Sequence, residues 1–128
     1  MDEQKVEKDL PYDTLKNKKE FDFVYKNSNK IRSDIFDICI LKKNFMESFY
    51  IKFKKQKNIS IVGLSVSKKI GKAVERNLIK RRFRVICAKL CKNVSLRQNL
   101  ILIIIAKEKI KQTPFFQLEK NILNILLK

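Results

Sequence analysis

The amino-acid sequence predicts a single α+β domain, an α/β sandwich in which one mixed sheet of about four strands packs against three helices. The chain has 128 residues, which is enough for one hydrophobic core and too few for two. Hydrophobic residues make up 45 % of it, so a core can form. Segments with apolar residues at every second position, typical of strands, alternate with segments that have helical spacing. The expected order of elements is α β β β α β α.

The N-terminal part of the chain is expected to hold an acidic tail and the first helix. Residues 1–22 carry seven acids and five lysines, a net charge of −2, so the rest of the chain carries +19. We interpret residues 1–13 as a disordered tail and residues 14–128 as one domain. Thr14 is the predicted N-cap of a helix over residues 15–26. Its apolar residues have helical spacing: Phe21, Val24 and Tyr25.

Three strands are predicted between that helix and the next one. Apolar residues alternate over residues 35–41, 49–53 and 58–67, as they do in half-buried strands. Residues 42–57 hold six lysines and one acid. We therefore expect this Lys-rich segment to be a solvated, positively charged hairpin that contains the second strand.

The second half of the chain predicts a long helix, a buried strand and a last helix. The long helix is expected over residues 71–92, followed by a loop over residues 93–99. Residues 100–106 are apolar throughout, which suits a strand buried on both faces. Thr113 and Pro114 have the order of an N-cap and a first helical residue, so the last helix begins there.

The charge of the chain excludes several classes of enzyme and favours a polyanionic partner. Thirty Lys and Arg against 13 Asp and Glu give a net charge of +17, and there is no His. The missing His excludes a Ser-His-Asp triad, a Cys-His pair and a His-bearing zinc site. Nucleic acid is the first candidate partner and an anionic membrane the second. No metal site is expected. We interpret the three cysteines as plain buried thiols: Cys39, Cys87 and Cys91.

The sequence also predicts where the protein works. Its N-terminus lacks the apolar region of a signal peptide. The longest apolar run, residues 100–106, is far short of the roughly 20 residues of a membrane-spanning helix. A cytoplasmic protein without a membrane partner is therefore expected.

A basic helix face is the most informative feature. Residues 68–84 hold eight cations and one acid. On a helical wheel, five polar residues share one arc: Arg76, Asn77, Lys80, Arg81 and Arg84. The apolar residues of this helix, with Val74, Leu78 and Val85 among them, are expected to pack on the sheet. A solvated surface face is one interpretation, but repulsion between like charges four residues apart favours a bound phosphate backbone.

Residues 62–81 resemble the signature of the protein subunit of bacterial ribonuclease P. In that family, a strand ending in Gly-Leu-Ser-Val-Ser-Lys-Lys precedes a helix with Ala-Val-x-Arg-Asn-x-x-Lys-Arg-x-x-Arg. Residues 15–25 are similar to the family's first helix. The resemblance implies a fold with a left-handed β-α-β crossover. It also implies an endonuclease that removes the 5′ leader of precursor tRNA. The catalytic centre and its Mg²⁺ would lie in the RNA subunit. This chain would then hold no catalytic or metal-binding residue.

The resemblance assigns roles to particular residues. Eight polar residues would contact the catalytic RNA: Lys68, Lys69, Lys72, Arg76, Asn77, Lys80, Arg81 and Arg84. Four residues would belong to a cleft for the leader: Phe21, Tyr25, Phe36 and Cys39. Ordinary core packing is the alternative for the three aromatic residues. The partners implied are the catalytic RNA and precursor tRNA, with one protein monomer per RNA.

Two residues depart from the family pattern, and three other functions remain as alternatives. Leu78 stands where the family often has a third basic residue, and Cys39 where relatives often have Tyr. A ribosomal protein or RNA chaperone would share the charge without needing the contiguous signature over residues 62–84. A membrane-bound protein would need an exposed apolar helix face, and a metal-dependent nuclease would need clustered carboxylates.

Overall fold

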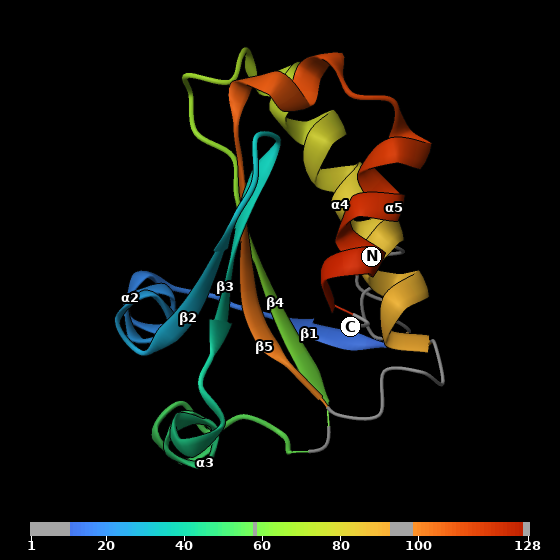
Figure 1. The fold of residues 1–128 in the computed structure, drawn as a ribbon. Coiled ribbons are helices and arrows are strands. Elements are labelled where there is room, and N and C mark those ends of the chain that lie inside the picture. The colour runs from blue at the N-terminus through green and yellow to red at the C-terminus, as the bar shows by residue number, and fades with distance from the viewer. Residues whose placement is uncertain (1–10, 58, 93–98, 127–128) are drawn as a thin grey trace, which may run out of the picture.

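The computed structural model describes residues 11–57, 59–92 and 99–126. One five-stranded sheet has helices on both of its faces (Figure 1). The strands are β1 (Tyr12–Thr14), β2 (Ser28–Arg32), β3 (Phe36–Leu41), β4 (Ser60–Ser65) and β5 (Ile101–Ala106). The helices are α2 (Lys18–Lys26), α3 (Lys43–Lys52), α4 (Ala73–Lys92), the 3-10 helix η1 (Glu108–Gln112) and α5 (Phe115–Leu126). The predicted α+β class is confirmed, with one more strand and one more α-helix than expected.

The sheet is mixed, as predicted. Its strand order is β1-β4-β5-β3-β2. β4 runs parallel to both β1 and β5, whereas β3 is antiparallel to β5 and β2. Because α4 connects the parallel neighbours β4 and β5, the three elements form a β-α-β unit. The left-handed sense of this crossover stays a prediction from the resemblance.

The central strand β5 is buried on both faces, which confirms the prediction for residues 100–106. Leu102 and Ile104 belong to a core that also includes residues of α4 and α5. Ile101 and Ile103 belong to a second core, under α2 and α3. Figure 1 shows α4 and α5 on one side of the sheet and α2 on the other. The sheet therefore separates two apolar layers.

Helix α4 lies on the sheet through a narrower apolar stripe than predicted. Its buried residues recur every three or four positions: Ile79, Phe83, Ile86, Cys87 and Leu90. The expectation that Val74, Leu78 and Val85 also pack on the sheet is wrong, since they are 80 %, 39 % and 43 % exposed. These three residues lie on the opposite side of the helical wheel, beside the cations.

The Lys-rich segment is a helix and not the predicted hairpin. The expected strand over residues 49–53 falls largely within α3, which spans Lys43–Lys52. Phe45, Phe49 and Phe53 recur every fourth residue and pack with Phe23 of α2. Residues four positions apart share a face in a strand as well as in a helix, so these rings alone do not decide between the two. A strand would also place Ile51 on the face of Phe49 and Phe53, whereas the helix turns it outward, 66 % exposed.

Two edge strands were not predicted, and the first helix begins later than expected. β1 includes Tyr12 and Asp13, which belong to the predicted tail; residues 1–10 of that tail lie outside the described residues. β2 follows α2 directly. Asn17, and not Thr14, is the N-cap of α2. Of the loop predicted over residues 93–99, only residue 99 is described.

Candidate nucleic-acid interface

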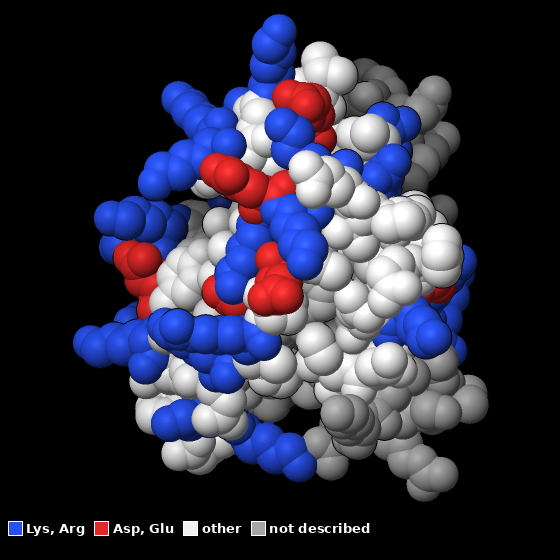
Figure 2. Space-filling view, turned by 45° about the horizontal axis from the view of Figure 1, so that its top comes forward, with Lys and Arg blue, Asp and Glu red and all other residues white. Residues whose placement is uncertain are grey.

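The predicted cationic residues lie on and just before α4, and most of their charge is available. Six of the eight polar residues are exposed: Lys68, Lys69, Lys72, Asn77, Arg81 and Arg84. Arg76 and Lys80 are half-buried. None of these cations forms an ion pair with any carboxylate of the described residues. Figure 2 shows that Lys and Arg side chains cover much of one side of the molecule, with fewer Asp and Glu among them.

The single acid of the basic segment is used at the start of α4. Glu75 Oε1 accepts a hydrogen bond of 2.9 Å from the backbone N–H of Lys72, as in one half of a capping box. This hydrogen bond, followed by the nearby Lys111 ammonium, lowers the pKa of the Glu75 carboxyl. Arg76 Nε donates to the carbonyl of Gly71 over 3.2 Å. These contacts fix where the helix begins, so its cations have a defined position.

A groove of about 800 Å³ lies between α2 and α4, along the edge of the sheet at β1 and β4. It brings together four residues that the sequence assigned to RNA binding: Phe21, Lys80, Arg81 and Arg84. The rest of its lining comes from residues 12–16, from β4 and from the following turns of α4: Tyr12, Asp13, Thr14, Leu15, Lys16, Val62, Gly63, Leu64, Val85 and Ala88. An aromatic ring and three cations therefore meet in one concave site.

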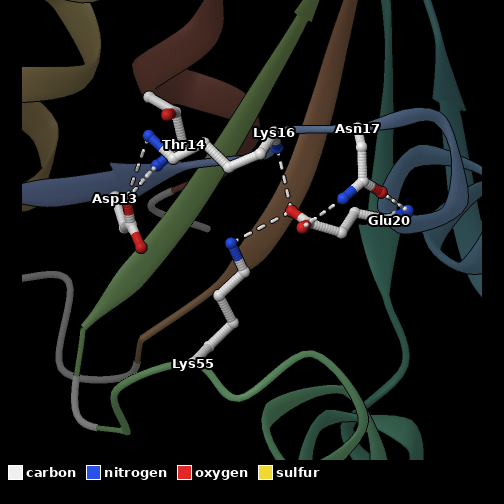
Figure 3. A network of polar contacts seen from close by, with 6 residues as sticks. All are labelled: Asp13, Thr14, Lys16, Asn17, Glu20 and Lys55. Carbon is white, nitrogen blue, oxygen red and sulfur yellow. Dashed lines mark hydrogen bonds and ion pairs between the residues drawn. The ribbon is translucent and has the colours of Figure 1, made fainter.

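A buried polar network positions α2 at this groove (Figure 3). The Glu20 carboxylate accepts hydrogen bonds from the Lys16 N–H at 2.8 Å and from Asn17 Nδ2 at 3.2 Å. Lys55 Nζ lies 3.1 Å from Glu20 Oε1, and both side chains are almost fully buried. Asn17 Oδ1 in turn accepts the Glu20 N–H at 3.1 Å. The first turn of α2, which carries Phe21, is thus attached to the Lys-rich segment through Lys55.

Phe21 and Tyr25 lie on the α2 face that looks toward β4. The Phe21 ring lies against Gly63, where an added Cβ would be 2.8 Å from a ring carbon. Both aromatic residues are half-buried, with ring centroids 6.3 Å apart. Burial raises the pKa of the Tyr25 hydroxyl, and a hydrogen bond to the Ser65 side chain partly offsets this. Only Phe21 lines the groove itself.

The other two residues assigned to the leader cleft are buried in the cores. Phe36 is 0 % exposed, faces the layer under α4 and α5 and does not line the groove. Cys39 is 1 % exposed and lies in the layer under α2 and α3. Neither side chain forms part of the surface. Along a strand, Phe36 and Cys39 point to opposite faces because they are three positions apart.

Sequence reasoning missed the contribution of the segment before α2. Tyr12 and Asp13 line the groove, although both fall within residues 1–13, which the sequence predicts to be a tail. The Tyr12 hydroxyl is buried without a hydrogen-bond partner among the described residues. Burial raises its pKa strongly. The apolar ring of Tyr12 was the one signal in the sequence that this segment packs on the domain, since a short edge strand has no periodic pattern.

The described residues contain neither a group of metal-binding side chains nor a membrane-spanning helix. Within residues 11–57, 59–92 and 99–126, no three His, Cys, Asp or Glu side chains are grouped closely enough to hold a metal ion. In the same ranges, no helix is both long and apolar enough to cross a bilayer.

Known proteins similar to this chain form one family. The sequence model of the family Ribonuclease P matches residues 11–128. The ribonuclease P protein component of Helicobacter acinonychis is 38 % identical over 135 aligned residues, which cover 99 % of this chain and 86 % of that protein. The structure of the Staphylococcus aureus RNase P protein has a TM-score of 0.64 and 28 % identity, covering 89 % of this chain and 91 % of that one. The RNase P protein from Thermotoga maritima shares the fold, with a TM-score of 0.70 at 20 % identity over 90 % of this chain and 96 % of that one.

Proposed function

Because this chain belongs to the ribonuclease P protein family, we propose that its groove and its cationic helix face bind two different RNAs. The chain is the protein subunit of ribonuclease P, a ribonucleoprotein that acts in the 5′ processing of tRNA. The RNAs that we assign to the two surfaces are the catalytic RNA and the 5′ leader of precursor tRNA. We infer a complex with one protein per catalytic RNA in the bacterial cytoplasm.

The exposed face of α4 is the proposed contact with the catalytic RNA. Lys72 and Arg76 lie on this face outside the groove. Arg81 and Arg84, at the border between the face and the groove, present planar guanidinium groups, which bind phosphate oxygens in pairs. The Asn77 amide lies exposed beside them and supplies a donor and an acceptor for sugars or bases. A phosphate backbone along this face would relieve the repulsion between cations one helical turn apart. The absence of ion partners for these side chains among the described residues supports this role.

The groove is the proposed site for the leader, and one observation carries this assignment. Phe21 from α2 and Lys80, Arg81 and Arg84 from α4 line the same groove although they are far apart in the sequence. Single-stranded RNA is bound by aromatic rings that stack on bases and cations that contact phosphates. The groove is open at the edge of the sheet and provides both. Tyr25, next to Phe21, extends the aromatic surface toward Ser65.

The chemistry of cleavage is assigned to the RNA subunit. Mg²⁺ is the metal ion that the family implies, and it would supply the activated water and neutralise phosphate charge there. The described residues have no cluster of carboxylates that fits such an ion. This chain would therefore bind and orient RNA without taking part in proton or metal chemistry.

Reconstitution tests the proposed function. The protein alone should bind precursor tRNA without cutting it. With the catalytic RNA, it should lower the Mg²⁺ concentration needed for half-maximal 5′ maturation and should tighten binding of leader-bearing precursor more than binding of mature tRNA. The catalytic RNA alone is the control. An Mg²⁺ requirement that the protein does not change would refute the proposal.

A further inference from the structure

Strand β4 extends beyond its partner β1 and has a free edge in the groove. β1 pairs only as far as Val62 of β4, opposite Thr14. β4 continues to Ser65. The chain leaves the sheet after Leu15, because the Lys16 N–H turns to the Glu20 carboxylate and Asn17 begins α2 (Figure 3). The part of β4 after Val62 thus lacks a neighbouring strand on this side.

The backbone of Leu64 faces this free edge. In a parallel ladder, the N–H and C=O of one residue point to the same side, and successive residues alternate. The Ile61 N–H donates to the Leu100 carbonyl, toward β5, at 2.9 Å. The Val62 carbonyl accepts from Leu15, toward β1, at 3.1 Å. Leu64 therefore directs both its N–H and its C=O to the β1 side, away from β5.

No group within the described residues pairs with these two atoms. The next contacts of the ladder would come from Leu15 and Asn17, but neither residue makes a hydrogen bond with Leu64. Leu64 is half-buried and lines the groove. A strand edge of this kind holds a donor and an acceptor at fixed positions, and such groups are rarely left without partners.

The surroundings of this edge favour a nucleotide over a peptide strand. The Phe21 ring lies against the adjacent Gly63, where a flat base can stack beside the strand. Lys80, Arg81 and Arg84 line the opposite wall and suit a phosphate backbone. A peptide added to the sheet would need several consecutive free residues, whereas here one donor and acceptor pair faces the groove.

We propose that the N–H and C=O of Leu64 hydrogen-bond the edge of one unpaired base of the RNA strand in the groove. This proposal rests on the proposed leader site and adds a specificity to it. Adenine and cytosine present a ring-nitrogen acceptor beside an amino donor, whereas guanine and uracil present a keto acceptor beside a ring N–H donor. Since the order of donor and acceptor on Leu64 is fixed, one group of bases fits a given pose better than the other.

Base replacement in the leader tests this proposal with the unmodified holoenzyme. Each leader position near the cleavage site receives all four bases in turn, and the dissociation constant of the precursor is measured without cleavage, in Ca²⁺. At one position, adenine and cytosine should differ as a pair from guanine and uracil by about 3- to 10-fold, the effect of one or two hydrogen bonds. The catalytic RNA alone should not show this grouping at that position.

A backbone change in the protein gives a second, independent test. Incorporation of the α-hydroxy acid analogue of leucine at position 64 replaces the N–H by an ester oxygen and keeps the side chain. The paired preference should fall to less than about 2-fold, while binding of mature tRNA stays unchanged. Circular dichroism and the unfolding midpoint would show whether the ester-containing protein folds.

The outcomes separate this proposal from the function on which it rests. If precursor binds no tighter than mature tRNA, the leader site itself is refuted. If precursor binds tighter but no leader position groups the bases in this way, the role of Leu64 is refuted and the leader site stands. A preference that persists in the folded ester-containing protein also refutes the role of Leu64.

Discussion

Phe21 is the residue whose position depends most directly on a single small neighbour. Its ring occupies the space where Gly63 has no side chain, and the Glu20 network fixes the turn that carries it. We predict that Phe21→Ala weakens binding of leader-bearing precursor to the holoenzyme by about 5- to 100-fold, the range of one lost stacking contact. Binding of mature tRNA should change little.

A matched variant controls for the loss of an aromatic ring. Phe116 on α5 is 68 % exposed and does not line the groove. Phe116→Ala should leave binding of both RNAs unchanged. Equal losses for precursor and mature tRNA in Phe21→Ala would mean that the ring only packs in the fold.

The Glu20 and Lys55 pair is predicted to stabilise the fold as a unit. Both side chains are nearly buried, at 5 % and 10 % exposure, so Lys55→Met leaves a buried carboxylate without its cation. We expect a loss of about 3 kcal/mol in the free energy of unfolding. In the Glu20→Gln background, the same Lys55 substitution should cost much less, because no buried charge remains. Urea denaturation of the four proteins measures this difference.

An exposed ion pair of the same segment is the control. Lys57 and Glu47 lie 2.7 Å apart with more than half of each side chain exposed. Lys57→Met should cost less than about 1 kcal/mol. If Lys55→Met lowers the free energy of unfolding by an equally small amount, the Glu20 and Lys55 pair does not hold α2 in place.

At the scale of elements, α4 combines a buried stripe with a charged face. We predict that Lys80→Ala weakens assembly with the catalytic RNA or binding of precursor and reduces the slope of log K against log salt by about one ion. Lys89→Ala is the control, since Lys89 lies on the same helix but is paired with Glu119 at 3.3 Å. Filter binding at several salt concentrations measures both. If Lys80→Ala and the wild-type protein have the same slope of log K against log salt, this face of α4 contacts solvent and not RNA.

The elements that were predicted correctly have strong internal patterns. Residues 100–106 are apolar at every position, so burial on both faces follows from the sequence. α4 is long and bears an apolar stripe that the sheet buries. The sequence did not predict how α4 is rotated about its own axis on the sheet. Val74, Leu78 and Val85 widen the apolar arc of the helical wheel beyond the stripe that packs on the sheet.

The elements that were missed depend on tertiary contacts. β1 and β2 are short edge strands whose stability comes from pairing with β4 and β3, respectively. Residues 28–32 contain one apolar residue, Ile31, so no periodicity marks them. In α3, the alternation of Phe49, Ile51 and Phe53 fits a strand. The packing of Phe49 and Phe53 against Phe23 of α2 stabilises a helix instead, and it could not be predicted from this segment alone.

At the scale of the whole molecule, the site exists only because the sheet edge joins two helices. The cations of α4 were predictable from the sequence, and the resemblance assigned Phe21 to the leader. The groove that unites them could be seen only in the fold, as could the burial of Phe36 in the layer under α4 and α5. The net charge of +17 attracts RNA over long distances and so contributes to affinity. It does not determine which RNA binds to the groove and which binds to the face of α4.

Photocrosslinking of the leader to the protein shows directly whether the leader lies in the groove between α2 and α4. A precursor tRNA with 4-thiouridine at single leader positions is bound to the holoenzyme and irradiated, and the crosslinked peptides are identified by mass spectrometry. We expect crosslinks at Phe21 and in the part of α4 that contains Lys80, Arg81 and Arg84, all of which line the groove. Crosslinks confined to α5 or β2, with none in the groove, would contradict this placement of the leader.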